Sequence, residues 1–230
     1  MEKELLSGKA DLHVHSKYSR DGFSSVKDIL ENAKKRGMDV IAITDHNTIE
    51  GAKEAQKIAS GFGVEVVIGE EMDAKEGDVI GLFLKEAIKP KMTVLETVRE
   101  IHSQGGLAII PHPGNWSLRG VSLKVLSKIF EEVDAIETLN ASWAGRIRRG
   151  KAKKFNKELF HLAETGGSDS HIALTVGRAY ASFQGKTSSD LYNAIKNKKT
   201  APGGELWSLM EHLVFFAYSP LRILKIFKIY

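Results

Sequence analysis

The chain has 230 residues, a length that suits one domain with a single substantial core. With 42% hydrophobic and 27% charged residues it has the composition of a folded globular protein, which excludes a disordered chain. The absence of cysteine excludes disulfides, thiolate metal sites and cysteine nucleophiles, and leaves histidine and carboxylate as the strong metal ligands. The net charge of +4 is compatible with anionic substrates, but scattered lysines on solvated helix faces produce the same balance.

Short β-branched apolar runs alternate with segments of helical period along most of the chain. The predicted strands are residues 10–15, 39–44, 64–70, 78–84, 107–111, 134–138, 167–169 and 179–183. One predicted helix begins at Ser25 and ends near Gly37, and another begins at Thr93 and ends at Gly105. Further helices are predicted over residues 49–59, 123–130, 156–164 and 191–198.

This alternation predicts an α/β protein with parallel strands, arranged as a barrel or as an open doubly wound sheet. No GxGxxG follows the first strand and no GxxxxGK[ST] occurs, so the nucleotide-binding doubly wound fold lacks its usual motifs. A barrel would carry its functional site at the C-terminal ends of its strands, where residues far apart in the sequence meet.

Histidines are concentrated at these strand ends. Five of the eight lie at or just after the end of a predicted strand, namely His13, His15, His46, His112 and His171. The other three lie in predicted helices or in the tail, where surface or packing roles are usual, namely His102, His161 and His212.

Two of the strand-end motifs hold paired side chains. His13 and His15, in DLHVHS, are two residues apart on a strand and therefore share a face. Asp169 and His171 have the same spacing in GGSDSH, after a glycine turn. Both imidazoles of the first pair can therefore reach one metal ion.

The other motifs place single ligands at strand ends. His46 follows a strand in ITDHN, and His112 lies between two prolines in IIPHP. Glu70, in IGEE, would be a buried charge at the end of a strand, for which a cation is the natural partner. Each motif alone also fits a purely structural role, whereas five motifs of one chemical type predict a metal site.

In this order and spacing, DLHVHS, TDHN, GEE, IIPHP and GSDSH resemble the motif set of the polymerase-and-histidinol-phosphatase (PHP) family of metal-dependent phosphoesterases. The resemblance extends over about residues 9–200. It implies a distorted (β/α)7 barrel with two or three divalent transition metal ions, manganese, iron or zinc, at the C-terminal rim. It also implies hydrolysis of a phosphomonoester or phosphodiester, such as a nucleotide, a short oligonucleotide or a phosphorylated metabolite.

The resemblance also implies a ligand set. The first metal, with its activated water, would be held by His13, His15, Glu70 and Asp169. Glu70 would bridge to a second metal, which His112 also binds. The third ion would be held by His46, His171 and Asp21, the last of these matching the family's SDG aspartate despite one inserted residue. Two cations roughly 3.5–4 Å apart would activate a bridging water and clamp the phosphoryl oxygens.

Two further positions, Asp78 and Arg146, each allow more than one interpretation. Many relatives have a histidine where this chain has Asp78, a harder and anionic ligand that favours manganese or iron over zinc or leaves the site with two ions. Asp78 could equally cap a strand and face solvent. Arg146 lies in a basic loop near the expected rim and could make a forked contact to phosphate, although a solvated helix start fits it as well.

Two other functional classes remain open at this point. One is C–N hydrolysis by an amidohydrolase-like barrel, but such enzymes use a metal-bridging lysine and no predicted strand ends in lysine. The other is a non-catalytic, metal-stabilised module like the PHP segments of some DNA polymerases, against which the intact ligand set argues.

We expect a PHP-type barrel over residues 1–204 and an apolar, basic tail over residues 205–230. The tail has no run long and uncharged enough to span a membrane. It could cover the base of the barrel, form a homo-oligomer contact, or lie on a membrane surface as a peripheral helix, in that order of preference. The start of the chain has no apolar segment of a secretory signal, so we expect a cytoplasmic protein.

Overall fold

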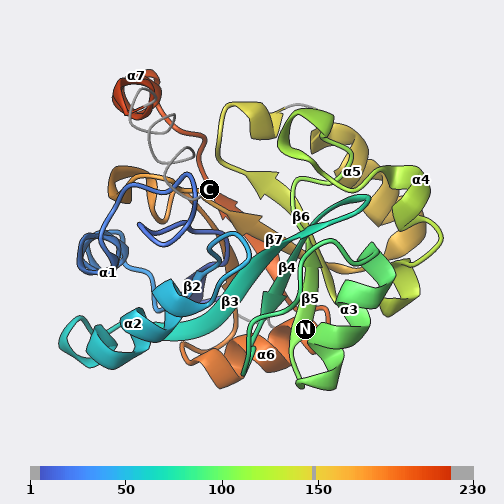
Figure 1. Cartoon of the computed structure of the whole chain (residues 1–230), viewed down its shortest axis with the longest axis horizontal. Helices are drawn as coiled ribbons and strands as arrows, with labels where there is room; N and C mark the ends of the chain where they lie inside the picture. Colours follow the sequence, from blue (N-terminus) through green and yellow to red (C-terminus); the bar gives the residue numbers. More distant parts are fainter. Residues whose placement is uncertain (1–5, 147–148, 219–230) are drawn as a thin grey trace.

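The computed structural model describes residues 6–146 and 149–218 (Figure 1). Nine strands form one sheet in the order β7-β6-β5-β4-β3-β2-β1-β8-β9. The strands are β1 Gly8–Asp11, β2 Val40–Ile43, β3 Glu65–Ala74, β4 Gly77–Leu82, β5 Leu107–Ile110, β6 Ala135–Asn140, β7 Ala163–Gly167, β8 Ala179–Phe183 and β9 Ala201–Gly204. The α-helices are α1 Val26–Lys35, α2 Glu50–Ile58, α3 Val94–Ser103, α4 Leu123–Leu126, α5 Arg149–Phe155, α6 Ser188–Lys196 and α7 Leu209–Ala217.

Strands β1 to β7 follow one another around the sheet in chain order and form a nearly closed barrel. A parallel bridge between Val14 and Ser170 joins the segment after β1 to the segment after β7. The amide of His15 donates to the carbonyl of Ser170 at 2.8 Å across this junction. The distorted barrel expected from the sequence is confirmed, and its closure lies beside the HxH and GSDSH motifs.

The prediction of parallel strands throughout is wrong at β4 and β8. Only Lys75 and Glu76 separate β3 from β4, and so short a connection joins antiparallel strands. Strand β4 is therefore antiparallel to both β3 and β5, and β8 is antiparallel to β1 and β9. As a consequence the start of β4, with Asp78, lies at the same rim as the end of β3, where Asp78 pairs in register with Asp73.

Several predicted boundaries also differ from the structure. Strand β3 continues to Ala74, β9 was not expected, and α4 has only four residues. Strand β7 occupies Ala163–Gly167, where the sequence predicts the end of a helix. The helix stops because His161 adopts a left-handed conformation, with φ of 51°, and the side chain of Asn156 hydrogen-bonds both the amide and the carbonyl of Leu162.

The helix starts agree with the sequence where local capping decides them. Ser25 caps α1 by accepting from the amide of Asp28, and Thr93 and Glu96 form a reciprocal capping box at α3. Inside the barrel one apolar cluster takes side chains from every strand from β1 to β8 and from α6, so a packed core supports the rim.

The C-terminal segment continues the barrel domain rather than leaving it at residue 204. Trp207 is buried, its amide donates to the carbonyl of Ala141, and its indole Nε1–H donates to the carbonyl of Ser168 at 2.9 Å. Helix α7 follows and contributes Phe215 to the cavity at the rim, whereas the sequence favours a cover of the barrel base. Residues 219–230 lie outside the described part of the chain.

None of the helices described here combines the length and the apolar character needed to cross a membrane.

Candidate metal centre

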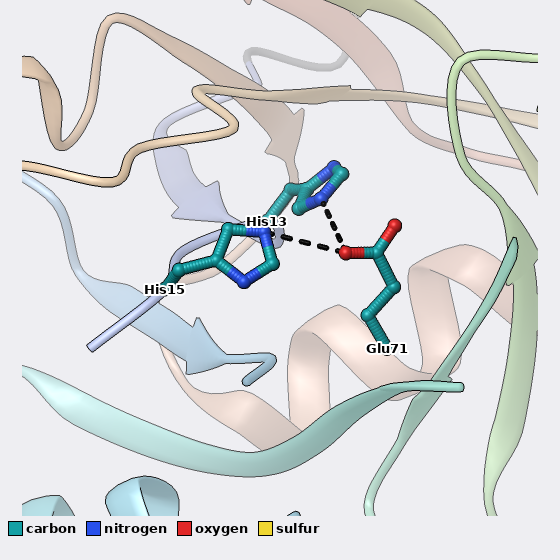
Figure 2. Close-up of side chains that lie close together, drawn as sticks. All are labelled: His13, His15 and Glu71. Atoms are coloured by element: carbon teal, nitrogen blue, oxygen red, sulfur yellow. Dashed lines mark hydrogen bonds and ion pairs between the residues drawn. The ribbon is translucent and has the colours of Figure 1, made fainter. Parts of the chain in front are cut away.

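Two histidines from the end of β1 converge on one carboxylate from β3. The Nε2 atoms of His13 and His15 each lie 3.3 Å from Oε2 of Glu71. Figure 2 shows both rings directed at this carboxylate. All three side chains are at most 2% exposed. The other carboxylate oxygen, Oε1, lies 3.3 Å from His112 Nε2, so the two oxygens of Glu71 face different histidines.

The structure places Glu71 in the cluster, at the position for which the sequence predicts Glu70. Side chains alternate along a strand, and Val67, Gly69 and Glu71 share the face that points into the barrel. Glu70 lies on the opposite face, where its Oε2 accepts a hydrogen bond from the amide of Ile88 at 2.8 Å. The strand predicted from the sequence ends at Glu70, so the prediction places Glu70 at the rim. In the structure the strand continues to Ala74, and Glu71 lies on the face that points into the barrel.

The remaining predicted ligands are brought together. Among the described residues, five groups of three donor atoms occur in which all atoms lie within 4.8 Å of one another. The groups are His13, His15 and Glu71; His13, His112 and Asp169; His15, Asp21 and His46; His15, Asp169 and His171; and Glu71, Asp78 and His112. Eight of the nine predicted ligands are members, and Glu71 stands in place of Glu70.

A carboxylate that the sequence analysis did not single out orients His13. Oε1 of Glu137, on β6, lies 3.1 Å from His13 Nδ1, and its Oε2 accepts from the amide of His112 at 2.8 Å. Such a partner fixes the ring so that Nε2 faces the cluster. Gly167 permits this packing, because a Cβ there would lie 2.5 Å from the Cβ of His13.

Two of the grouped residues have strained backbones. His112 and Asp169 have φ of 33° and 51°, in the left-handed region that side chains other than glycine rarely occupy. Both follow the end of a strand, and their conformations turn the side chains toward the rim. Strain of this kind persists where the surrounding structure holds it, commonly at functional sites.

Burial and neighbouring charges shift the pKa values of His13 and His15 in opposite directions. Burial, and then the neighbouring His171, lower the pKa of His15 to about 4, so its ring is neutral at pH 7. Burial also acts to lower the pKa of His13, but Asp169, Glu71 and Glu137 outweigh it and hold this pKa well above the ordinary value. Burial acts to raise the pKa of Glu71, but His46 and His13 outweigh it, and the carboxylate is ionised.

These residues fit divalent metal ions. Nε2 of His15 is buried and forms no hydrogen bond within the described chain, although oxygens of Glu71 and Asp169 lie 3.3 and 3.5 Å away. Buried polar atoms are normally paired, and a neutral imidazole with a free lone pair beside two carboxylates is suited to a shared cation. Imidazole and carboxylate together suit zinc, iron or manganese.

Asp78 faces the cluster rather than solvent. It is 2% exposed, and the guanidinium of Arg119 donates to its Oδ1 at 3.0 Å. Burial, and then the Glu71 carboxylate, raise the pKa of Asp78 to about 7. A second arginine, Arg20, makes a forked contact to Asp73, which is also 3.5 Å from His46 Nδ1. The sequence analysis assigned no role to either arginine or to Asp73.

The cluster opens into a cavity of about 330 Å³. Arg20 and Arg119 line it together with His46, His112 and His171. The opposite lining is apolar and comes from α7 and the loop after β6. The dimensions are those of a small-molecule site.

Of the other residues named from the sequence, one lies away from the cluster, one lines the cavity and one has a side chain outside the described structure. His102 lies on α3 and pairs with Asp134 at 2.7 Å, away from the cluster, as predicted. His212 does line the cavity, contrary to the sequence analysis. Arg146 belongs to the short helix η4 (Ala144–Arg146), but its side chain lies outside the described part of the structure, so its contact with phosphate remains a prediction.

The sequence matches the PHP domain family over residues 11–198. The chain belongs to this family. An uncharacterized protein of Methanocaldococcus jannaschii is 44% identical over 144 residues, which are 58% of this chain and 82% of that protein. A probable phosphatase of Shewanella loihica is 25% identical over 197 residues, which are 73% of this chain and 79% of the relative.

Solved structures share the fold. A two-domain protein of Bacteroides vulgatus, containing a predicted PHP-like metal-dependent phosphoesterase, has a TM-score of 0.73 at 19% identity, covering 86% of this chain and 64% of that chain. The family and its phosphatase-named relatives support a hydrolase acting on phosphate esters at the level of the family, and they specify no substrate.

Proposed function

We propose that the protein hydrolyses a phosphomonoester or phosphodiester at a cluster of two or three divalent metal ions. The observation that carries the proposal is Glu71, a buried carboxylate whose two oxygens face different histidines. This arrangement is suited to a carboxylate that bridges two ions.

The proposed ligands follow from the donor groups. His13, His15, Glu71 and Asp169 would hold the first ion, and Glu71 with His112 and Asp78 the second. Asp21, His46 and His171 lie around His15 on the far side and would hold a third. Ions bound there would polarise the phosphoryl oxygens and lower the pKa of a water that serves as the nucleophile.

Residues around the ligands hold the geometry that this chemistry requires. Glu137 fixes the ring of His13, and the carbonyl of Asp169 accepts from Nδ1 of His171 at 2.9 Å, which leaves Nε2 of His171 directed at Asp21. Arg20 and Arg119 place positive charge at the cavity, where an anionic ester would enter. Arg146 remains a proposed phosphate contact from the neighbouring loop.

Manganese, iron and zinc all suit this donor set, and Asp78 favours the harder ions at the second position. The competing C–N hydrolases usually carry a metal-bridging lysine. No lysine lines the cavity in the part of the chain that the structure describes.

The test combines metal content with an activity screen. We expect at least two transition metal ions per chain by elemental analysis after reconstitution with manganese, iron or zinc. The manganese-loaded protein should then hydrolyse at least one of three probes: a phosphomonoester, a phosphodiester or a short oligonucleotide. Less than one ion per chain, or full metal loading with no hydrolysis of any probe, would contradict the proposal.

A further inference from the structure

The cavity has a second wall whose chemistry differs from that of the metal centre. Trp143 comes from the loop after β6, Trp207 precedes α7, and His212, Phe215 and Phe216 lie on α7 itself. The match to the PHP family ends at residue 198, so most of this wall comes from chain beyond the matched region. We call these five residues the aromatic wall.

The aromatic wall is attached firmly to the barrel. Ser208 and Glu211 form a capping box at the start of α7, and the buried Glu211 also accepts from Arg178 at 2.8 Å and from Arg36 at 3.2 Å. With the Trp207 indole hydrogen-bonded to Ser168, these contacts hold α7 at the rim. Phe215 reaches the metal centre, because its ring centroid lies 5.8 Å from that of His171.

Two pairs of rings in the wall meet edge to face. Trp143 and His212 have centroids 5.9 Å apart at 74°, and Trp207 and Phe215 have centroids 5.6 Å apart at 70°. Trp143 and Phe216 keep 61% and 52% of their surfaces exposed, although they line a cavity. Exposed aromatic faces beside a cavity favour the binding of another flat ring.

His212 adds one polar atom to this apolar wall. Its Nδ1 lies 2.8 Å from the carbonyl of Ser208, which can only accept, so Nδ1 carries the proton. In the neutral ring Nε2 is then an acceptor. It is buried and has no hydrogen-bond partner within the described residues. A buried acceptor left unpaired is costly, so a ligand that offers an N–H group would be bound preferentially.

We propose that the aromatic wall binds a planar heteroaromatic ring that carries an N–H donor, and that this ring is the base of a nucleotide whose phosphate lies at the metal centre. The proposal rests on the proposed function for the position of the phosphate. The ring would lie against Trp143 and Phe216 and donate to His212 Nε2. Stacking on exposed aromatic rings is the usual way in which proteins hold a base without a base pair.

Two esters that differ only in the base test the proposal: adenosine 5′-monophosphate and ribose 5-phosphate. We expect the ratio of their kcat/KM values to favour the nucleotide by about tenfold or more in the wild type. Phe216→Ala should lower this ratio about tenfold. Leu213→Ala, a control on the exposed side of α7 whose residue does not line the cavity, should leave it unchanged.

Binding of adenosine, which has no phosphate, separates this proposal from the proposed function. Calorimetry should show weaker binding to Phe216→Ala and to His212→Phe, which keeps an aromatic ring but removes the acceptor, and unaltered binding to Leu213→Ala. Adenosine binding with this pattern but no ester hydrolysis would support the aromatic wall and contradict the phosphoesterase. Ester hydrolysis with no preference for the nucleotide would overturn the proposed base site alone. Equal losses of adenosine binding in Leu213→Ala and Phe216→Ala would do the same.

Discussion

The two walls of the cavity differ in composition, in attachment and in their place in the chain. The metal wall consists of buried histidines and carboxylates at strand ends, supported from below by the packed interior of the barrel. The aromatic wall consists of rings on α7, just before α7 and in the loop after β6, most of them partly exposed, and it is attached mainly through Trp207 and Glu211. The strand ends therefore determine where charge is stabilised, whereas the helix determines which groups fit beside that charge. A change in the helix can therefore alter specificity without dismantling the metal centre.

The largest effect is expected inside the metal wall. His13→Ala and Asp169→Ala each remove a side chain that belongs to two donor groups, so we expect loss of bound metal and a fall in kcat of at least about 100-fold. His102→Ala is the matched control, because His102 lies on α3 away from the cluster. Metal content and kcat would be measured at equal folded concentration, and similar losses in all three variants would break the division between strand-end and helix histidines.

The neighbouring pair Glu70 and Glu71 tests the face of β3. We expect Glu71→Gln to lower kcat by about 100-fold or somewhat less, since glutamine keeps one oxygen but loses the charge that the two proposed ions would share. Glu70→Gln should leave kcat within about twofold, because Glu70 faces away and accepts from Ile88, as glutamine also can. A larger loss in Glu70→Gln than in Glu71→Gln would contradict the observed register.

The attachment of the aromatic wall should depend on pH. Burial acts to raise the pKa of Glu211, but hydrogen bonds from Arg178 and Ser208 outweigh it and hold the folded pKa below the ordinary value of 4.5. A lowered folded pKa contributes stability that is present above pH 4.5 and is lost as the pH falls through the folded pKa.

Glu211→Gln should therefore lower the free energy of unfolding by about 1.5–3 kcal/mol at pH 7. The difference from wild type should shrink below pH 4.5, the ordinary value for this carboxyl. Denaturant unfolding at several pH values measures it. A difference that stays constant from pH 7 into the acid range would show that the charge of Glu211 does not hold α7.

The smallest effect is expected at Asp78, where the metal wall meets Arg119. Asp78→His removes a negative charge, so the pKa of the attacking water should fall and the acidic limb of the pH–rate profile should move to lower pH. Arg119 already offsets part of that charge, and we expect a shift of less than about one pH unit, with a metal preference moved toward zinc.

Arg119→Gln supplies the matched comparison for Asp78. It removes a positive charge from the same ion pair, so the acidic limb should move to higher pH, opposite to the shift in Asp78→His. If the pH–rate profiles of both variants coincide with that of the wild type, Asp78 is not a ligand in the metal wall.

The sequence alone determined the chemical type of the site and its position at strand ends. Histidines and carboxylates that end apolar strands in a barrel meet at one rim, and this follows from the strand period and the barrel fold. It also determined the starts of α1 and α3, because capping depends on residues three positions apart in the chain.

Only the tertiary structure decided which carboxylate of β3 enters the cluster, because a shift of one residue moves a side chain to the other face of a strand. The antiparallel course of β4 depends on a strand direction that apolar patterns do not specify. The pairing of Asp78 with Arg119 joins residues 41 positions apart, and the support of His13 by Glu137 joins residues 124 positions apart. The place of His212 in the cavity is set in the same way. The sequence places His212 only in an apolar, basic tail, and the docking of α7 through Trp207 and Glu211 brings its ring to the cavity.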